Sequence, residues 1–398
     1  MLPGRLHDLT FQKIKELSLP ESETLDYKEK VENSNRGRQD FAHDVCAFAN
    51  TDGGDLIIGV TERNLVPSAF PGIDSPAEER TRLTDIIASR IEPRIHGIDY
   101  KILEIDGKGK GLLIVRIPKS YNGPHVDHEK RTFYRRHNEK NDRMSWKEIS
   151  ESFMARKSVF DRIRDFLNGR IQVFFVPTVP TIGTTNYWYF GPPVALVQGI
   201  TSILHLIPLQ SFENNESLNV QELRKRYGNV GPFPLVLTRE GMSWEEFSRL
   251  NIDGILRYQA PGVNHSYTQM FRNGAIEAVR VYREFEGKTP IFPILQFENE
   301  VRRWVRISLE QFGEIGIQPP FHVSVFIKDG AGSVIDTRSP GDEFPIVPSA
   351  YSSLDRNPLF LPEILLENVE DTLESQLMEL FTPLWNAYGL PRPNFQVG

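Results

Sequence analysis

Acidic side chains and a lysine stand close together near the start of this chain of 398 residues. The segment Glu21–Lys28 reads ESETLDYK and carries three carboxylates ahead of its lysine. Residues 24–28 alternate as a strand does, which places Asp26 and Lys28 on one face because side chains repeat every two residues. Carboxylates and an ammonium group on one face suit phosphate chemistry, either binding a nucleic-acid backbone or cutting it.

Cleavage by such a segment would require a divalent metal. Mg²⁺ or Mn²⁺ takes oxygen ligands, usually one or two carboxylates together with a substrate phosphate. The bound ion can activate water and stabilise a leaving oxygen, and Lys28 could stabilise charge on the phosphoryl group. The alternative is that Glu21, Glu23 and Asp26 are solvated residues around an edge strand.

A helix, a glycine turn and a buried strand follow between residues 37 and 60. Helical spacing of apolar residues predicts a helix over 37–50, and the turn residues Asn50–Gly54 end it. The apolar run Leu56–Val60 predicts a strand buried on both faces. Gly53 and Gly54 could place backbone amides against a phosphate, although a simple helix-to-strand turn also explains them.

Basic residues gather between positions 130 and 143, where six Lys and Arg side chains stand against two acids. The six are Lys130, Arg131, Arg135, Arg136, Lys140 and Arg143. Phe133 and Tyr134 are interleaved with them, so cations could pair with phosphates while rings stack on unpaired bases. The whole chain has a net charge of -7, so nucleic-acid binding has to come from such a local patch. A solvated strand and loop is the alternative.

Composition excludes several other classes of protein. The single cysteine, Cys46, rules out a disulfide within the chain and a cysteine-based zinc site. The start shows no signal peptide, and the most apolar stretch, residues 193–209, is too short and too interrupted to span a bilayer. We therefore expect a cytoplasmic protein that does not associate with membranes.

The length allows two or three domains, and the pattern of elements predicts a mixed α/β (α+β) fold. We expect an α/β domain over residues 1–150, a linker helix over 151–170 and a second α+β domain of unknown sensor or regulatory role over 171–398. In the second half, the sequence predicts strands over 171–176, 195–197, 235–237 and 321–327, and helices over 297–312 and 363–388.

A series of motifs resembles the Schlafen AlbA_2 domain over about residues 10–150. In order, they are Glu21–Lys28, 47–54, 58–60, 91–93, 115–118, 123–125 and 133–136. The resemblance implies a small α/β domain that binds nucleic acid and that, in some members, is a metal-dependent RNase acting on tRNA or rRNA.

The resemblance also implies site residues. Glu21 and Asp26 match the two acids of the family's first motif, although Asp26 replaces a commoner glutamate. Glu62 is the acid nearest to the third, in a position where aspartate is common. These three would hold Mg²⁺ or Mn²⁺, and Lys28 would contact the scissile phosphate.

The leading hypothesis is thus a metal-dependent endoribonuclease acting on structured RNA such as tRNA, with RNA favoured over DNA. Family analogy suggests a role in antiphage defence, and also a homodimer or higher oligomer, because the chain shows only one lobe of the clamp expected of family nucleases. One alternative is a non-catalytic DNA- or RNA-binding regulatory protein with a ligand- or partner-binding C-terminal domain. Another is an interaction protein in which the acidic motif only caps the fold.

Overall fold

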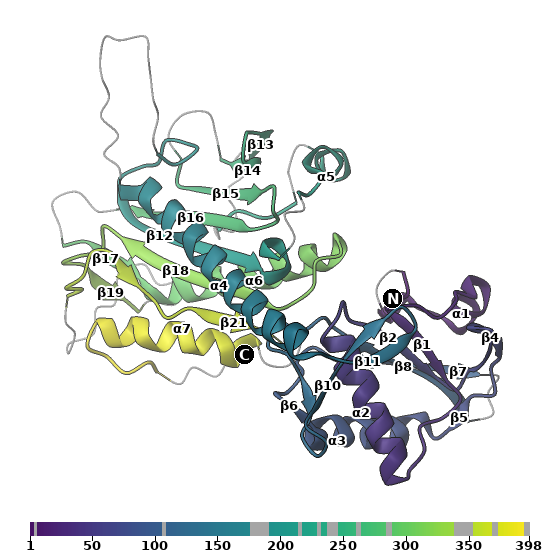
Figure 1. Ribbon diagram of the computed structural model, residues 1–398. Helices are drawn as coiled ribbons and strands as arrows, with labels where there is room; N and C mark the ends of the chain where they lie inside the picture. Colours follow the sequence, from purple (N-terminus) through teal and green to yellow (C-terminus); the bar gives the residue numbers. More distant parts are fainter. Residues whose placement is uncertain are drawn as a thin grey trace. The chain divides into compact units, whose positions relative to one another are not determined.

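The chain forms two compact units, Met1–Val159 and Phe160–Gly398, in a computed structural model (Figure 1). The structure describes residues 1–3, 6–105, 109–175, 191–213, 217–228, 232–236, 246–259, 264–283, 289–337, 353–367 and 373–393. The division between the units falls inside α4 (Trp146–Phe175), a helix of 30 residues. Helices and sheets are mixed in both units, which confirms the predicted α+β class.

A five-stranded sheet forms the centre of the first unit. Its strands are β1 (Leu25–Lys28), β2 (Gly54–Ile58), β8 (Lys110–Ile117), β7 (Asp99–Ile105) and β5 (Ile73–Asp74). The short β1 pairs in parallel with β2, and β8 runs antiparallel to β2 and pairs with β5 and β7. The strand predicted over 24–28 is therefore an edge strand, on which Asp26 is buried and Lys28 is partly exposed.

Helices cover both faces of this sheet, which explains why β2 is buried along its length. On one face, α2 (Asn35–Ala49) and α3 (Pro76–Arg90) pack Phe41, Val45 and Ile86 against the sheet. On the other face, η1 (Leu6–Asp8) and α1 (Phe11–Leu17) pack against residues that include Leu25 and Tyr27.

A second, smaller sheet carries the basic residues. Its order is β11-β10-β9-β6, with bounds β11 (Lys140–Arg143), β10 (Thr132–His137), β9 (Val126–Asp127) and β6 (Ile91–Glu92). Strands β10 and β11 form an antiparallel hairpin, and residues 130–143 are called the basic hairpin below. A separate two-stranded hairpin, β3 (Thr61–Arg63) and β4 (Val66–Ala69), follows β2 in the chain.

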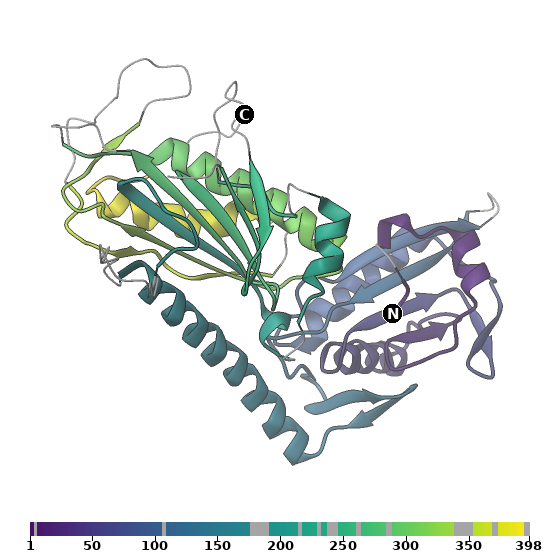
Figure 2. The ribbon, with the colours of Figure 1, turned by 90° about the horizontal axis from the view of Figure 1, so that it is seen from above.

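The second unit is built on one large antiparallel sheet with helices on both faces (Figure 2). The sheet contains β12 (Gly199–Pro208), β13 (Phe247–Leu250), β14 (Gly254–Tyr258), β15 (Ser266–Phe271), β16 (Ile276–Arg283), β18 (Phe321–Lys328), β20 (Leu359–Phe360) and β21 (Ile364–Leu366). Outside it lie η2 (Leu209–Phe212), α5 (Val220–Tyr227) and the parallel pair β17 (Ile291–Pro293) and β19 (Val334–Asp336).

Side chains of β12 alternate between two cores. Leu204 and Leu206 belong to the core under α6 (Ile294–Glu314) and α7 (Leu373–Ala387), whereas Ile203 packs in the core that contains Phe174 of α4. Both faces of the sheet are thus covered, and β12 is buried at nearly every position.

Several predictions for the second half were wrong. Residues 171–175 are the last residues of α4 rather than a strand, and residue 176 lies outside the described residues. Their aromatic and β-branched side chains suit either element, and the packing of Phe174 onto the sheet favours the helix. The predicted strand over 195–197 is reduced to one bridge, Leu196 to Asn264.

Residues 235 and 236 form no strand, and residue 237 is outside the described part of the chain. The helix predicted over 363–388 is shorter, because 364–366 is strand β21 and α7 covers only Leu373–Ala387. The helix over 297–312 and the strand over 321–327 are confirmed by α6 and β18. Among the described residues, none of the helices combines the length and apolarity that crossing a bilayer requires.

Candidate acidic site and nucleic-acid interface

The predicted acids come together around the tip of the β3–β4 hairpin. The backbone N–H of Glu21 donates to the carbonyl of Leu65 at 2.7 Å, and Leu65 N–H donates to Glu62 Oε2 at 2.8 Å. Glu21 Oε1 accepts a hydrogen bond of 2.9 Å from the backbone N–H of Tyr27 on β1. One turn therefore positions Glu21 and Glu62, which lie 41 residues apart in the numbering.

Glu21 also lies near Asp26, whose negative charge acts on its carboxyl group. Burial raises the pKa of Glu21 to about 7; the hydrogen bond from Tyr27 opposes this shift, and the charges of Asp26 and Glu62 add to it. The structure thus gathers the three predicted carboxyl groups into one like-charged cluster.

Lys28 lies beside this cluster, on the face of β1 that it shares with Asp26. Its Nζ is 3.5 Å from Asp26 Oδ2 and 2.8 Å from Asp44 Oδ2. Burial would lower the pKa of Lys28, but the two carboxylates outweigh burial and raise it above its ordinary value. Lys28 therefore keeps its positive charge.

Asp44 is a residue of this site that the sequence analysis did not predict. It lies on α2, is 6% exposed, and accepts a hydrogen bond of 2.5 Å from Asn141 Nδ2 of the basic hairpin. Burial raises the pKa of Asp44 from its ordinary value, and Lys28 opposes the shift. An aspartate three residues after Phe41 lies on the apolar side of the helix, which is a signal that it needs a buried partner.

Arg136 connects the basic hairpin to the segment Glu21–Lys28 through a hydrogen bond and an ion pair. The side chain is 1% exposed, and its Nη2 donates to the carbonyls of Ser22 at 3.0 Å and Glu139 at 3.2 Å. The same nitrogen is 3.7 Å from Asp26 Oδ1, and the guanidinium carbon lies 4.3 Å from the ring centroid of Phe48. Arg136 is thus buried within the unit instead of lining its surface.

The other cations of the hairpin divide into two groups. Lys130, Arg131, Lys140 and Arg143 are exposed, and within the described residues none of these side chains forms an ion pair. Arg135 is half-buried, with Nη1 3.2 Å from Glu148 Oε1 on α4.

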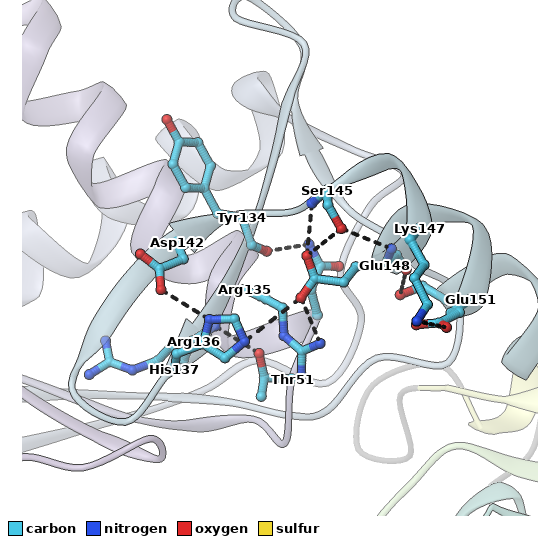
Figure 3. A network of polar contacts seen from close by, with 12 residues as sticks. Thr51, Tyr134, Arg135, Arg136, His137, Asp142, Ser145, Lys147, Glu148 and Glu151 are labelled. Carbon is cyan, nitrogen blue, oxygen red and sulfur yellow. Dashed lines mark hydrogen bonds and ion pairs between the residues drawn. The ribbon is translucent and has the colours of Figure 1, made fainter.

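Figure 3 shows Arg135, His137 and Glu148 pointing toward one another where the hairpin meets the start of α4. His137 Nδ1 lies 3.0 Å from Asp142 Oδ2, and Ser145 N–H donates to Glu148 Oε2 at 2.8 Å. These contacts occupy acids of the hairpin region and leave its exposed cations available for an external anion.

The double glycine has a packing role in the structure. Gly53 is buried with φ of 70°, a left-handed conformation that favours glycine, and its N–H donates to the carbonyl of Phe48 at 2.9 Å. A Cβ on Gly54 would lie 2.3 Å from the ring of Phe48. Gly54 thus permits close packing between α2 and β2, and Gly53 permits close approach of the backbone at Ile117 and Lys119. The Gly53 amide bonds to Phe48 and is not directed at solvent.

Two of the predicted acids are of the residue types that bind a divalent metal ion. In the portion of the chain that the structure describes, no group of three or more His, Cys, Asp and Glu side chains is arranged to hold one. Glu21 and Asp26 nevertheless offer two neighbouring carboxyl groups, and the 3.5 and 3.7 Å separations of Asp26 from its cations are longer than hydrogen bonds. Two carboxylates suffice for Mg²⁺ when substrate phosphate supplies further ligands.

The chain was compared with solved structures and with curated proteins. Two solved structures are similar to part of the chain, each with a TM-score of 0.22. The N-terminal domain of a RecG-related protein from Nitrosomonas europaea is 23% identical, over 27% of this chain and 72% of that one. The DIP2311 protein from Corynebacterium diphtheriae is 18% identical, over 31% of this chain and 22% of that one. No curated protein matches the chain.

The comparison with protein families gives a match within the first unit. Residues 21–145 match the family model described as Schlafen, AlbA_2, and this stretch includes the acidic cluster, Lys28 and the basic hairpin. The stretch 21–145 of this chain therefore matches the Schlafen AlbA_2 domain.

Proposed function

We propose that the first unit is a metal-dependent endoribonuclease that acts on structured RNA such as tRNA. The observation that carries the proposal is the placement of the acidic cluster directly against the basic hairpin. Arg136 reaches from the hairpin to Asp26, and Asn141 reaches from it to Asp44. A strand of RNA held by the exposed cations would pass close to the carboxylates.

In this proposal, different residues bind the RNA backbone, contact the reacting phosphate and hold the metal ion. Lys130, Arg131, Lys140 and Arg143 pair with backbone phosphates, and Lys28 contacts the phosphoryl group at the site of cleavage. Asp44 and Asn141 fix the position of Lys28 and of the hairpin beside it. Glu21 and Asp26 would hold Mg²⁺ or Mn²⁺, which would supply an activated water and charge stabilisation when bound. Glu62 would add negative charge beside them.

Cleavage of total tRNA in the presence of Mn²⁺ or Mg²⁺ tests the catalytic part. We expect the parent to cleave, and Glu21→Gln and Asp26→Asn to lose roughly 100-fold or more of the rate while they keep RNA affinity. Glu23→Gln is the matched control, an acid of the same segment outside the cluster. Equal cleavage by all four proteins would indicate a contaminant or a different site.

Salt-dependent binding tests the interface. Lys140→Glu and Arg143→Glu should weaken RNA binding, and replacement by alanine should reduce the slope of log affinity against log salt by about one per cation. Binding by a parent that never cleaves would favour the non-catalytic regulator. Absence of salt-dependent binding would favour the interaction protein.

Two further parts of the proposal rest on family analogy alone: preference for RNA over DNA and a role in antiphage defence. Action in the cytoplasm rests on the sequence expectation given above. Assembly as a homodimer or higher oligomer also rests on family analogy. A second copy of the chain would supply the second lobe of a clamp around the RNA. Light scattering at high concentration tests this assembly, and a monomer would contradict it.

A further inference from the structure

Trp146, the first residue of α4, has a side chain that lies almost entirely in solvent. It is 88% exposed, the largest value among the large apolar side chains that the structure describes. Tryptophan is usually well buried, because its ring system carries one of the largest apolar surfaces of any side chain. An exposed indole on an ordered helix therefore calls for a partner.

The backbone beneath Trp146 is held firmly against the basic hairpin. Ser145 and Glu148 form a reciprocal capping box around it, with Ser145 N–H donating to Glu148 Oε2 at 2.8 Å and Glu148 N–H to Ser145 Oγ at 3.3 Å. Glu148 also binds Arg135 of β10, as Figure 3 shows. The first turn of α4 is thus fixed relative to the hairpin before any ligand arrives, which lowers the entropy cost of binding.

Charge around Trp146 favours a nucleotide over an apolar protein surface. Arg143 precedes it by three residues and Lys147 follows it directly, and both side chains are exposed. Lys147 Nζ also lies 3.8 Å from Glu151 Oε1 in a solvent-exposed ion pair, which is weak in water. Asp142 is engaged by His137, and Glu148 by Arg135. An apolar partner would have to desolvate the cations, whereas a nucleotide offers a flat base to the indole and a phosphate to the cations.

We propose that Trp146 is a stacking platform for an unpaired base of the bound RNA, whose backbone is held by Arg143 and Lys147. This inference rests on the RNA binding proposed above and deepens it. The substrate must present a single-stranded loop or end beside the segment that the basic hairpin grips.

Binding of labelled RNA in EDTA, where metal-dependent cleavage is suppressed, tests the platform. One ligand is a single-stranded twelve-residue uridine oligonucleotide, and the other is a blunt duplex of the same length. Trp146→Ala should lower the affinity for the single strand about tenfold or more and leave duplex binding within about twofold. Trp146→Phe keeps an aromatic ring and should retain most of the affinity.

Phe153→Ala provides a matched control, because Phe153 is another exposed aromatic residue of α4, two turns further along. This variant should bind both ligands as the parent does. Quenching of tryptophan fluorescence by the single strand should be smaller in Trp146→Phe than in the parent, which reports contact with the indole directly.

Four outcomes would overturn the inference. Unchanged single-strand affinity in Trp146→Ala, or equal losses in Trp146→Ala and Phe153→Ala, would exclude a stacking role specific to Trp146. A change in oligomeric state without a change in RNA affinity would assign the indole to a protein interface. A parent that binds neither ligand would overturn the proposed function and this inference together.

Discussion

The two units each contain a charged network, and the networks differ in how completely their carboxylates are paired. In the second unit, Glu277 is fully buried and each carboxylate oxygen has two partners. Arg170 of α4 donates to both oxygens at 2.8 and 2.7 Å, Tyr267 donates to Oε1 at 2.8 Å, and His205 Nε2 lies 3.0 Å from Oε2. Nothing in this arrangement is left for a ligand.

The acidic cluster of the first unit is organised in the opposite way. Glu21 faces the like-charged Asp26 and Glu62, and the cations nearest to Asp26 stand at 3.5 and 3.7 Å. Residues of the same chemical types thus form two kinds of network. The Glu277 network is closed, because every carboxylate oxygen is paired, and it holds α4 against the sheet. The acidic cluster is open, because its negative charge is only partly balanced by nearby cations. The candidate site is therefore identified by carboxylates that lack full pairing with cations or donors, and not by the presence of charged residues alone.

The largest expected effect comes from breaking the closed network. Glu277→Gln leaves the buried guanidinium of Arg170 without a countercharge and should lower the free energy of unfolding of the second unit by about 4 kcal/mol. Denaturant unfolding monitored separately for the two units measures it. Glu310→Gln, on an exposed position of α6, is the control and should stay within about 0.5 kcal/mol of the parent. A loss below 1 kcal/mol in Glu277→Gln would refute the closed-network description.

The pH dependence of stability should have opposite signs in the two units. Burial would raise the pKa of Glu277, but hydrogen bonds from His205 and Arg170 outweigh burial and lower it from 4.5 to about 2. Its contribution, about 3 kcal/mol, is present above pH 4.5 and is lost as the pH falls toward 2. The pKa of Glu21 is raised from 4.5 to about 7, so the first unit should lose stability as the pH rises through this range.

Unfolding measured between pH 2 and pH 8 in EDTA checks these two slopes. Glu21→Gln should remove the decline of the first unit between pH 4.5 and pH 7, because the titrating carboxyl group is gone. Parallel slopes in the two units would show that the two networks do not differ in the way described.

Two arginines of the basic hairpin, one buried and one exposed, allow paired and unpaired charges to be compared within a single element. Arg136→Ala removes hydrogen bonds to buried carbonyls and should destabilise the first unit by about 2 kcal/mol. Arg143→Ala should leave stability within about 0.5 kcal/mol and weaken RNA binding. Thermal unfolding and RNA titration of both variants provide the readout, and equal destabilisation would contradict the division of the hairpin into buried and exposed cations.

The smallest expected effect is that of Glu21→Gln on stability at neutral pH. Removing one charge from a like-charged cluster relieves repulsion, so the variant should be as stable as the parent or more stable, by up to about 1 kcal/mol. Denaturant unfolding in EDTA at pH 7.5 measures the difference. A clear loss of stability would mean that Glu21 serves the fold rather than a ligand.

Much of the first unit could be predicted from periodicity and turn residues. Alternation in residues 24–28 placed Asp26 and Lys28 on one face, and the structure brings Lys28 Nζ to 3.5 Å from Asp26 Oδ2. Leu25 and Tyr27, which alternate with them, are buried. The apolar spacing over 37–50 predicted α2. These predictions hold because local spacing alone decides which side chains share a face of an element. At residues 171–175 the composition suited a strand equally well, but the structure continues α4 through them and packs Phe174 against the sheet.

The sequence by itself determined which residue types were available, namely clustered acids, a lysine on the strand face and a run of cations with aromatic rings among them. Only the tertiary structure decided which of these stay open to a ligand. It buried Arg136 and left Arg143 exposed on the same hairpin, and it placed Asp44 of α2 against Lys28 of β1. The physical reason is that pairing and burial depend on contacts between elements far apart in the sequence, where a charge is retained only if it finds a partner or reaches solvent.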